Sequence, residues 1–215
     1  MTVAEQHVAV RPNVVDDPAH HASFLRQFLK SPGTVGAVAP SSPRLAARMM
    51  AAVDFSKAGV VLEYGPGTGA FTGAILERLR PGAKFVAVEL SPSYSEILAK
   101  RFPAARIVND SVANIEAICR AEGIPERGGV DVVLSGLPWA SFSDELQDEI
   151  LMPMLRVLKP GGVFVTFGYH IGTFLPAGKR FYAKARRLFA RVDRSELVWL
   201  NVPPAFVMRC ETRGT

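Results

Sequence analysis

The sequence predicts an α/β fold built on an open, mostly parallel sheet of seven strands. The first observation is Val60–Gly69, a short apolar run with β-branched residues that is typical of a buried parallel strand and ends in three alternate glycines. The second is a helical stretch at 70–79 directly after the glycines. The third is that further apolar runs alternate with helical segments through the rest of the chain.

The glycine turn between strand and helix indicates a nucleotide-binding site. Glycine tolerates a positive φ and has no Cβ to push a ligand away from the backbone. Gly65, Gly67 and Ala70 formally satisfy the dinucleotide fingerprint. Glu89 follows the second strand, 20 residues after Gly69, where an acid can accept both hydroxyls of a ribose. These features alone suit a nicotinamide ligand and an adenosyl ligand equally.

Two details favour S-adenosylmethionine. Glu63 lies two residues before Gly65, and an acid there suits a ligand with an ammonium and a sulfonium but suits a pyrophosphate poorly. The strand also begins near residue 60, behind a sizeable leader, whereas many dinucleotide folds open with it. The pattern Glu-x-Gly-x-Gly-x-Gly resembles the glycine-rich motif of class I S-adenosylmethionine-dependent methyltransferases. The alternative, a turn that only joins strand to helix, is opposed by Glu89 and the later motifs.

Length and composition predict one globular domain with an N-terminal extension. The 215 residues are 48% hydrophobic, and no stretch of about 18 consecutive apolar residues predicts a membrane span. The N-terminus lacks an apolar signal segment. Cys119 and Cys210 are too few and too distant to indicate a metal site or a disulfide scaffold. We therefore expect a cytoplasmic protein without a metal.

The net charge of +5 is unevenly distributed along the chain. Residues 18–53 carry four basic residues and no acid, and residues 172–194 carry seven basic residues and one acid. These clusters could face anionic lipid or nucleic acid, or they could be solvated helix faces without a partner.

The leader divides into a loose tail at 1–18 and a helical extension at 19–58, ahead of the domain at 59–215. Within the extension, apolar residues recur at helical spacing and basic residues occupy the rest of the wheel. The interfacial residues predicted there are Phe24, Leu25, Arg26, Phe28, Leu29 and Lys30. This helix either packs on the domain, or it enters a membrane surface or closes over the active site. Ser41 or Ser42 is placed to cap a second helix at 43–53.

The later elements follow in order. We expect strands at 85–89, 106–111, 130–135, 163–167, 191–200 and 205–211. Helices are expected at 93–102, 113–121, after a cap at Ser143, and at 179–190, with 157–162 as a helix end and turn. Ligands of open α/β sheets bind at the carboxyl ends of strands, so the loop that begins at Gly136 should lie beside the ligand.

The chain as a whole resembles the bacterial phospholipid N-methyltransferases, over about residues 20–210. The residues that carry the likeness are the helix at 24–30, the segment 35–42, the glycine motif, and Ser135-Gly136-Leu137-Pro138. The family is related to ribosomal RNA adenine dimethylases, which have an Asn-Leu-Pro-Tyr-type loop after strand four. Here the Asn is missing, and no helical RNA-binding domain follows residue 210, so nucleic acid is not the expected partner.

The resemblance implies the fold, the cofactor and the roles of individual residues. The two terminal strands should form an antiparallel hairpin, and S-adenosylmethionine should be the methyl donor. Its binding site would be formed by Glu63, Tyr64, Gly65, Pro66, Gly67, Thr68, Gly69, Glu89, Leu90, Asp110, Ser111, Val112 and Ser135. Within this set Glu63 would offer charge to the ammonium, Glu89 would bind ribose, and Asp110 would accept from adenine. Asp110 is equally suited to cap the next helix.

Candidate catalytic residues follow strands four and five. Ser135 and Gly136 would line the methyl group and the incoming amine. Trp139 or Tyr169 could stabilise a cationic amine by cation–π contact, although Trp139 is as easily explained by packing. His170 could assist loss of the amine proton or could be structural.

The expected activity is methylation of phosphatidylethanolamine towards phosphatidylcholine on an anionic membrane surface. The enzyme would be cytoplasmic and bound peripherally through its N-terminal helix. The alternatives are an adenine N6-methyltransferase of ribosomal RNA and a non-catalytic binding protein with the same fold.

Overall fold

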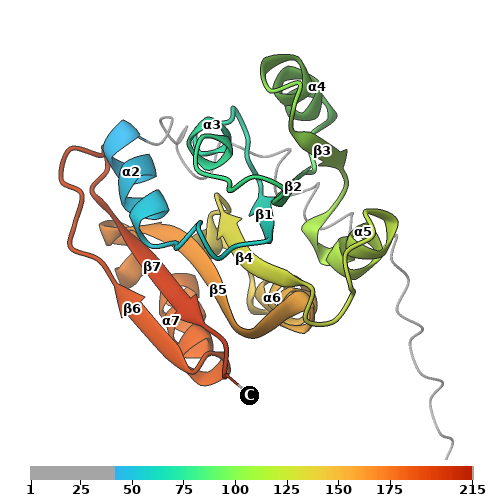
Figure 1. The fold of residues 1–215 in the computed structure, drawn as a ribbon. Helices are drawn as coiled ribbons and strands as arrows, with labels where there is room; N and C mark the ends of the chain where they lie inside the picture. The colour runs from blue at the N-terminus through green and yellow to red at the C-terminus, as the bar shows by residue number, and fades with distance from the viewer. Residues whose placement is uncertain (1–41, 215) are drawn as a thin grey trace, which may run out of the picture.

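The computed structural model describes residues 42–214, which form a sheet flanked by helices (Figure 1). The predicted tail and the helix at 24–30 lie outside the described residues. The strands are β1 (Val60–Tyr64), β2 (Lys84–Glu89), β3 (Arg106–Asn109), β4 (Val130–Ser135), β5 (Leu158–Tyr169), β6 (Arg191–Arg194) and β7 (Ala205–Glu211). The α-helices are α2 (Pro43–Ala51), α3 (Thr72–Leu76), α4 (Pro92–Arg101), α5 (Ile115–Ala121), α6 (Asp144–Val157) and α7 (Pro176–Leu188). Three short 3₁₀ helices are η2 (Val112–Asn114), η3 (Trp139–Ser141) and η4 (His170–Phe174).

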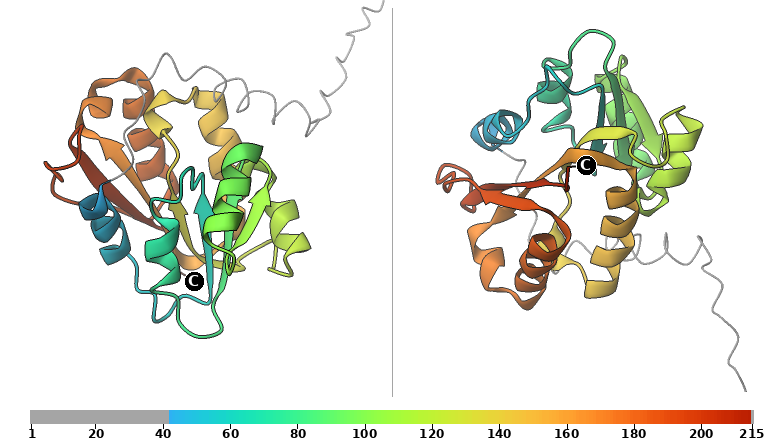
Figure 2. Two further views of the ribbon diagram at one scale, coloured as in Figure 1. Left: turned by 90° about the horizontal axis from the view of Figure 1, so that it is seen from above. Right: turned by 60° about the horizontal axis from the view of Figure 1, so that its bottom comes forward.

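The seven strands form one sheet in the order β3-β2-β1-β4-β5-β7-β6. The first five are parallel to one another, and β7 runs antiparallel to both β5 and β6. The predicted fold, including the C-terminal antiparallel hairpin, is therefore confirmed. Figure 2 shows this hairpin, in red, at the opposite end of the sheet from the green helices α4 and α5.

Helices cover both faces of the sheet, with α2, α3 and α4 on one side and α5, α6 and α7 on the other (Figure 1). The side chains of β1 alternate between the two layers, as a strand's period of two requires. Leu62 and Tyr64 belong to the core beneath α5, α6 and α7, whereas Val61 faces α2 and α3. Because β1 is central and covered on both faces, its residues are almost uniformly apolar.

Three elements differ most from their predicted bounds. The helix after the glycine loop has only five residues, Thr72–Leu76, rather than the ten expected. Strand β5 begins at Leu158, because the expected turn at 158–162 is held by the C-terminal segment through Gly161 N–H to Arg213 O and Thr212 N–H to Gly162 O. Strand β6 ends at Arg194, and the residues up to Ala205 form a loop.

Helix α2 is part of the domain's core, although its sequence lies within the predicted extension. Its N-cap Ser42 accepts a hydrogen bond from Leu45 N–H, and Leu45 and Met49 are completely buried. The Arg209 guanidinium of β7 donates to Ala52 O at the end of the helix. The described part of the extension is therefore docked on the sheet.

Candidate active site

A cavity of about 510 Å³ opens at the carboxyl ends of β1, β2 and β4. Its lining includes seven of the predicted site residues, namely Gly65, Gly67, Glu89, Leu90, Asp110, Val112 and Gly136. It is the place where ligands bind in open α/β sheets, and its volume suits a nucleoside-sized molecule. The structure thus brings together residues that are up to 71 positions apart in the chain.

The glycine loop lies between the ends of β2 and β4. Gly65 N–H donates to Val88 O at 3.0 Å, and Gly136 N–H donates to Tyr64 O at 2.8 Å. Gly65, Gly67 and Gly69 all have positive φ. A Cβ on Gly67 would meet no atom within 4 Å, which leaves this backbone open to a ligand, whereas a Cβ on Gly136 would lie 2.6 Å from Gly65 O. The chain therefore needs glycine here for conformation and for close approach.

The Glu89 carboxylate is anchored by two backbone donors. Gly67 N–H donates to Oε2 and Ser91 N–H donates to Oε1, each at 2.9 Å. These bonds tie the glycine loop to the start of α4 and fix the carboxylate at the cavity wall. Each oxygen retains acceptor capacity, so the group can still receive the hydroxyls of a ribose.

Asp110 orders the turn that precedes η2 and also lines the cavity. Its Oδ1 accepts from Ser111 N–H and from the Asn114 amide, which orders the turn into η2. The residue also lines the cavity, together with Val112. Ser111 is buried and caps η2 through Ala113 N–H, so its side chain supports the turn. A carboxylate has two oxygens, so Asp110 keeps acceptor capacity for a ligand in the cavity.

Glu63 is not among the residues that line the cavity. Its side chain is completely buried on the α3 side of β1, where the Thr72 hydroxyl donates to Oε2 at 2.8 Å. Burial raises the pKa of this carboxyl to about 8, and the charge of Glu89 adds to the effect. The raised pKa favours the protonated form of Glu63 at neutral pH, whereas the motif predicts a charged group. Its Oε1 has no hydrogen-bond partner within residues 42–214.

The other residues of the glycine motif support the loop through their backbone. Tyr64 is buried on the opposite face of β1, and burial raises the pKa of its hydroxyl well above the ordinary value. Pro66 O accepts from Gly69 N–H, and Thr68 O accepts from the Arg101 guanidinium. Their side chains are not among the cavity's lining residues.

Trp139 is a packing residue in this structure. It is 2% exposed, stacks on Phe181 of α7 with ring centroids 4.8 Å apart, and donates from Nε1 to Ser135 Oγ. Its indole is therefore buried in the core and is not among the residues that line the cavity. The Ser135 hydroxyl is buried by the same contact, while Gly136, Leu137 and Pro138 form the cavity wall.

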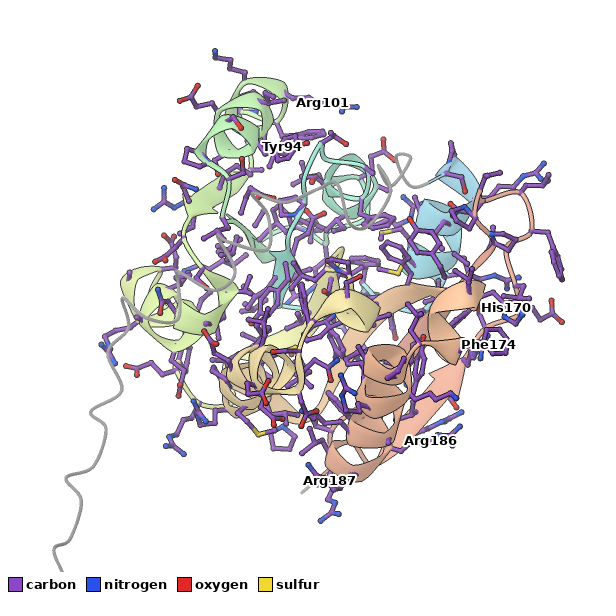
Figure 3. All side chains as sticks on the ribbon, turned by 180° about the vertical axis from the view of Figure 1, so that it is seen from behind. Tyr94, Arg101, His170, Phe174, Arg186 and Arg187 are labelled. Atoms are coloured by element: carbon purple, nitrogen blue, oxygen red, sulfur yellow. The ribbon has the colours of Figure 1, made fainter. Side chains whose placement is uncertain are left out.

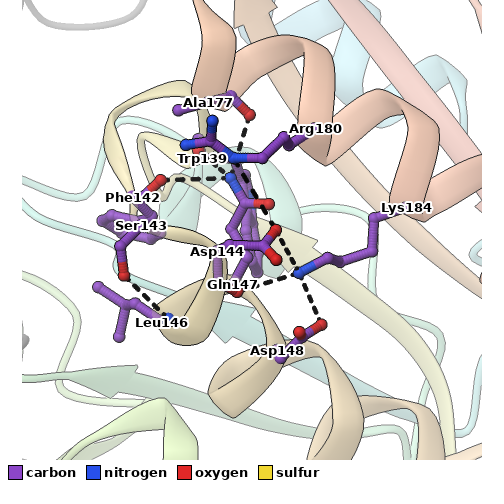
Figure 4. A network of polar contacts seen from close by, with 10 residues as sticks. All are labelled: Trp139, Phe142, Ser143, Asp144, Leu146, Gln147, Asp148, Ala177, Arg180 and Lys184. Carbon is purple, nitrogen blue, oxygen red and sulfur yellow. Dashed lines mark hydrogen bonds and ion pairs between the residues drawn. The ribbon is translucent and has the colours of Figure 1, made fainter.

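The segment 136–142 after β4 is held in place by a network of polar contacts with α6 and α7 (Figure 4). The Gln147 amide of α6 donates to the carbonyl oxygens of Trp139, Phe142 and Ala177. Lys184 of α7 is 6% exposed and pairs with Asp144 and Asp148 at 2.9 and 2.7 Å. These contacts fasten α6 to α7 and fix the position of η3.

The two candidates after β5 lie outside the cavity. Tyr169 packs edge-to-face on Phe167, with the ring centroids 5.6 Å apart, and its burial raises its pKa. His170 is exposed and lies against Phe174 on the surface (Figure 3). Neither residue is brought to the glycine loop, because β5 is separated from β1 by β4.

Several lining residues were not identified from the sequence. They are Val88, Ser91, Pro92, Tyr94 and Phe142. Tyr94 follows the Ser91 cap of α4, so an aromatic residue just after the end of the second strand was an available signal. Leu137 and Pro138 line the cavity as part of the loop that was expected beside the ligand.

Within residues 42–214, no group of three or more His, Cys, Asp or Glu side chains could hold a metal ion. The same part of the chain has no helix with the length and hydrophobicity needed to cross a bilayer.

This strand order, with a glycine loop after β1, an acid at the end of β2 and an antiparallel β7, defines a class I S-adenosylmethionine-dependent methyltransferase. A family model described as a methyltransferase domain matches residues 61–162. The O-methyltransferase from Bacillus cereus, solved with S-adenosylhomocysteine, has the same fold, with a TM-score of 0.61 at 15% identity over 93% of each chain. The methyl donor of the present protein is S-adenosylmethionine.

The sequence comparisons place the chain more narrowly. It is 33% identical over 87% of its length to an ornithine lipid N-methyltransferase from Singulisphaera acidiphila, of which it covers 93%. It belongs to the same methyltransferase family as that protein. It is also 34% identical, over 48% of its length, to a probable ribosomal RNA small subunit methyltransferase A from Methanospirillum hungatei, but spans only 37% of it.

The residues of the cavity fit the methyl donor. Gly67 offers open backbone, and the Glu89 and Asp110 side chains provide acceptors for hydroxyl and amino groups. The two acids also give the cavity an electronegative wall, which suits a cationic ligand.

Proposed function

We propose that this protein methylates the amino group of a membrane lipid, with phosphatidylethanolamine and ornithine lipid as the two candidate substrates. The observation that carries the proposal is the likeness to the ornithine lipid N-methyltransferase across nearly the whole of both chains. The resemblance of the sequence to phospholipid N-methyltransferases supports phosphatidylethanolamine. Both lipids present a primary amine, so the same displacement chemistry serves either one.

The structure of the acceptor side supports an alkyl amine over a nucleobase. The wall beside the glycine loop is made by Gly136, Leu137 and Pro138, which are apolar. Gly136 stands where the RNA enzymes have an asparagine directly before Leu-Pro, and it has no side chain. The hydroxyl of the preceding Ser135 already accepts from Trp139 Nε1 and from Leu137 N–H. A planar base would therefore lack the side-chain acceptor that orients its exocyclic amine.

When bound, the sulfonium donor supplies an already activated methyl group, so the protein's contribution is positioning and electrostatics. In this proposal Glu89 and the Gly67 backbone hold the donor's ribose and methionine parts. Asp110 fixes the adenine, and the wall at 136–138 directs the methyl group toward the opening. The acceptor amine attacks as the neutral base, and its proton leaves to water after transfer.

The test is transfer of labelled methyl groups from S-adenosylmethionine to three acceptors: phosphatidylethanolamine vesicles, ornithine lipid vesicles and ribosomal RNA. Label in a lipid fraction that is abolished by Glu89→Ala would support the proposal, and the preferred lipid would define the head group. Successive products, counted by mass, would show whether the reaction continues to phosphatidylcholine. Label in RNA alone would contradict the proposal and favour the adenine methyltransferase.

A further inference from the structure

Two exposed apolar segments lie outside the catalytic cavity. The first is η4 and the residue after it, with Ile171, Phe174 and Leu175 on the surface. The second is the loop between β6 and β7, which exposes Trp199, Leu200 and Val202. We call these six residues the apolar rim. Trp199 is 69% exposed and Val202 is 77% exposed, an unusual concentration of large hydrophobic side chains in water.

The two segments of the apolar rim are neighbours. Tyr169, the last residue of β5, pairs with Ala205, the first residue of β7. His170 N–H donates to Pro204 O at 2.8 Å, so the chain leaves β5 beside the point where it enters β7. Since β5 is parallel to β1 and β4, this is the edge of the sheet on which the cavity opens. The apolar rim and the mouth of the cavity therefore share one edge of the molecule.

The β6–β7 loop is held in place from inside. Asn201 is 3% exposed, and its Oδ1 accepts from Ser42 N–H while its Nδ2 donates to Pro203 O. Val198 and Ala205 form an isolated bridge at the base of the loop. With Asn201 turned inward, its neighbours Leu200 and Val202 are turned outward. A loop that is already ordered loses little conformational entropy when its exposed side chains are buried by a partner.

Basic residues flank the apolar rim. Arg44 and Arg48 of α2 line a shallow cavity with Trp199 and Leu200. Lys179 and Arg180 are exposed in the first turns of α7, directly after Leu175. Figure 3 shows Phe174 at one end of the α7 region and Arg186 and Arg187 at the other, so these last two are not part of the flank. The acids in this area are Glu196, which pairs with Arg48 of the flank at 3.9 Å, and Asp144, which pairs with Lys184 and with Arg180. The basic residues of the flank outnumber these acids.

We propose that the apolar rim is a membrane-docking surface that inserts Trp199, Leu200 and Phe174 into an anionic bilayer. The inference rests on the proposed function, since docking there would present the cavity's edge to lipid head groups. Apolar side chains surrounded by arginine and lysine match the layered chemistry of such a bilayer, and tryptophan favours its interface. None of the six residues of the apolar rim belongs to the predicted contact at 24–30, which lies outside the described residues.

The chain's own tryptophans provide the first test. It has two, and Trp139 is buried whereas Trp199 is exposed. The full-length protein is titrated, without methyl donor, with phosphatidylcholine vesicles that contain or lack phosphatidylglycerol. We expect the emission to shift to shorter wavelength with the anionic vesicles, and to be quenched by brominated acyl chains. Trp199→Phe should abolish both responses while leaving vesicle binding largely intact.

Three outcomes would overturn the proposal. The protein could bind the vesicles while the emission of Trp199 is not quenched by the brominated acyl chains. Trp199 could emit at short wavelength before vesicles are added, which would mean that another part of the chain covers it. Its emission could depend on protein concentration without vesicles, which would mean that a second copy covers it.

A variant series provides the second test. Trp199→Asp combined with Leu200→Asp should weaken partitioning into anionic vesicles by about tenfold or more, because charge replaces two large apolar groups. Ile97→Asp is the matched control, since Ile97 is 50% exposed but lies on α4 at the other end of the sheet. Arg44→Glu with Arg48→Glu should remove the preference for anionic over neutral vesicles. Thermal midpoints confirm that each variant is folded.

Partitioning that is unchanged in the Trp199 and Leu200 variant would overturn the docking proposal whatever the enzyme methylates. Methyl transfer to detergent-dispersed lipid tests the proposed function separately from membrane docking, because dispersed substrate needs no bilayer contact. A rim variant that binds vesicles poorly and still methylates dispersed lipid supports both proposals. Wild-type protein that inserts Trp199 and yet methylates neither lipid contradicts the proposed function alone.

Discussion

The two sides of the active-site cavity are built differently. On the donor side, Glu89 is held by backbone N–H groups of Gly67 and Ser91, and Asp110 by the N–H of the next residue. On the acceptor side, the segment 136–142 rests on side chains from α6 and α7, above all Gln147 and the ring of Phe181. Backbone contacts position the donor side, whereas long-range side-chain packing positions the acceptor side.

This difference predicts that substitutions on the two sides of the cavity will have different effects. Substitutions on the donor side should reduce affinity for the donor with little change in folding, because the backbone hydrogen bonds of the sheet remain. Substitutions on the acceptor side should reduce stability and methyl transfer together, because they leave buried groups without partners.

The largest effect is expected for Glu89→Ala. The carboxylate anchors the glycine loop and is the group placed to receive ribose hydroxyls, so its loss removes several charge-assisted hydrogen bonds. Affinity for S-adenosylhomocysteine, measured by calorimetry, should fall at least about a hundredfold, or roughly 2.7 kcal/mol. Glu89→Gln should be intermediate, because the amide can accept at only one of its two positions. An unchanged affinity would show that the donor binds elsewhere.

Gln147→Leu tests the acceptor side. The buried amide loses its hydrogen bonds to three carbonyl oxygens, so the unfolding free energy should fall by roughly 1–3 kcal/mol, although Trp139 O still accepts from Phe142 N–H. Gln147→Glu has the same size and should be destabilised at least as much, because it lacks the amide N–H groups and places a buried carboxyl against carbonyl oxygens. Donor affinity should stay within about twofold of wild type. If Gln147→Leu lowered donor affinity without lowering the free energy of unfolding, the proposed difference between the donor side and the acceptor side would be wrong.

Glu63→Gln should change how the free energy of unfolding depends on pH. The folded protein keeps the Glu63 proton up to a pKa of about 8, whereas the unfolded chain releases it near 4.5. In that window the folded state binds more protons, so its stability falls as pH rises, by about 1.4 kcal/mol per unit. The variant should lack this slope. Denaturant unfolding at pH 6 and 7 without donor measures the difference, and parallel curves for the two proteins would contradict the assignment.

The smallest effect is expected for His170→Ala. The imidazole is exposed and contacts Phe174 outside the cavity, so it has no path to the amine in this structure. Methyl transfer should stay within about twofold of wild type across the pH range. A loss of the alkaline or acidic limb of the pH–rate profile would restore His170 as the proton acceptor and would extend the active site beyond the cavity.

The donor side could be predicted from the sequence because its contacts are local. The spacing of Gly65, Gly67 and Gly69, and the position of Glu89 at the end of the next strand, indicate a nucleotide ligand, and Glu63 before the glycines favours S-adenosylmethionine. The same local logic identified Asp110, which lines the cavity and also orders the next turn. Glu63 was recognised as part of the motif, but its burial and raised pKa depend on how Thr72 of α3 covers β1.

The acceptor side could not be predicted in the same way. Whether Trp139 faces a substrate or the core depends on Phe181, 42 residues later in the chain, and no local pattern links the two. Tyr169 and His170 follow a strand that ends at the correct edge, yet the order of strands places them away from the glycine loop.

The sequence by itself determined the class of fold and the methyl donor, and it predicted several residues that line the cavity, because these depend on backbone conformation and on spacing within a strand–turn–helix unit. Only the tertiary structure decided which candidates share a cavity, which carboxyl has its pKa raised by burial, and which apolar residues remain on the surface. The physical reason is that burial and pairing depend on side chains brought together from distant parts of the chain. A local sequence pattern does not specify these long-range contacts.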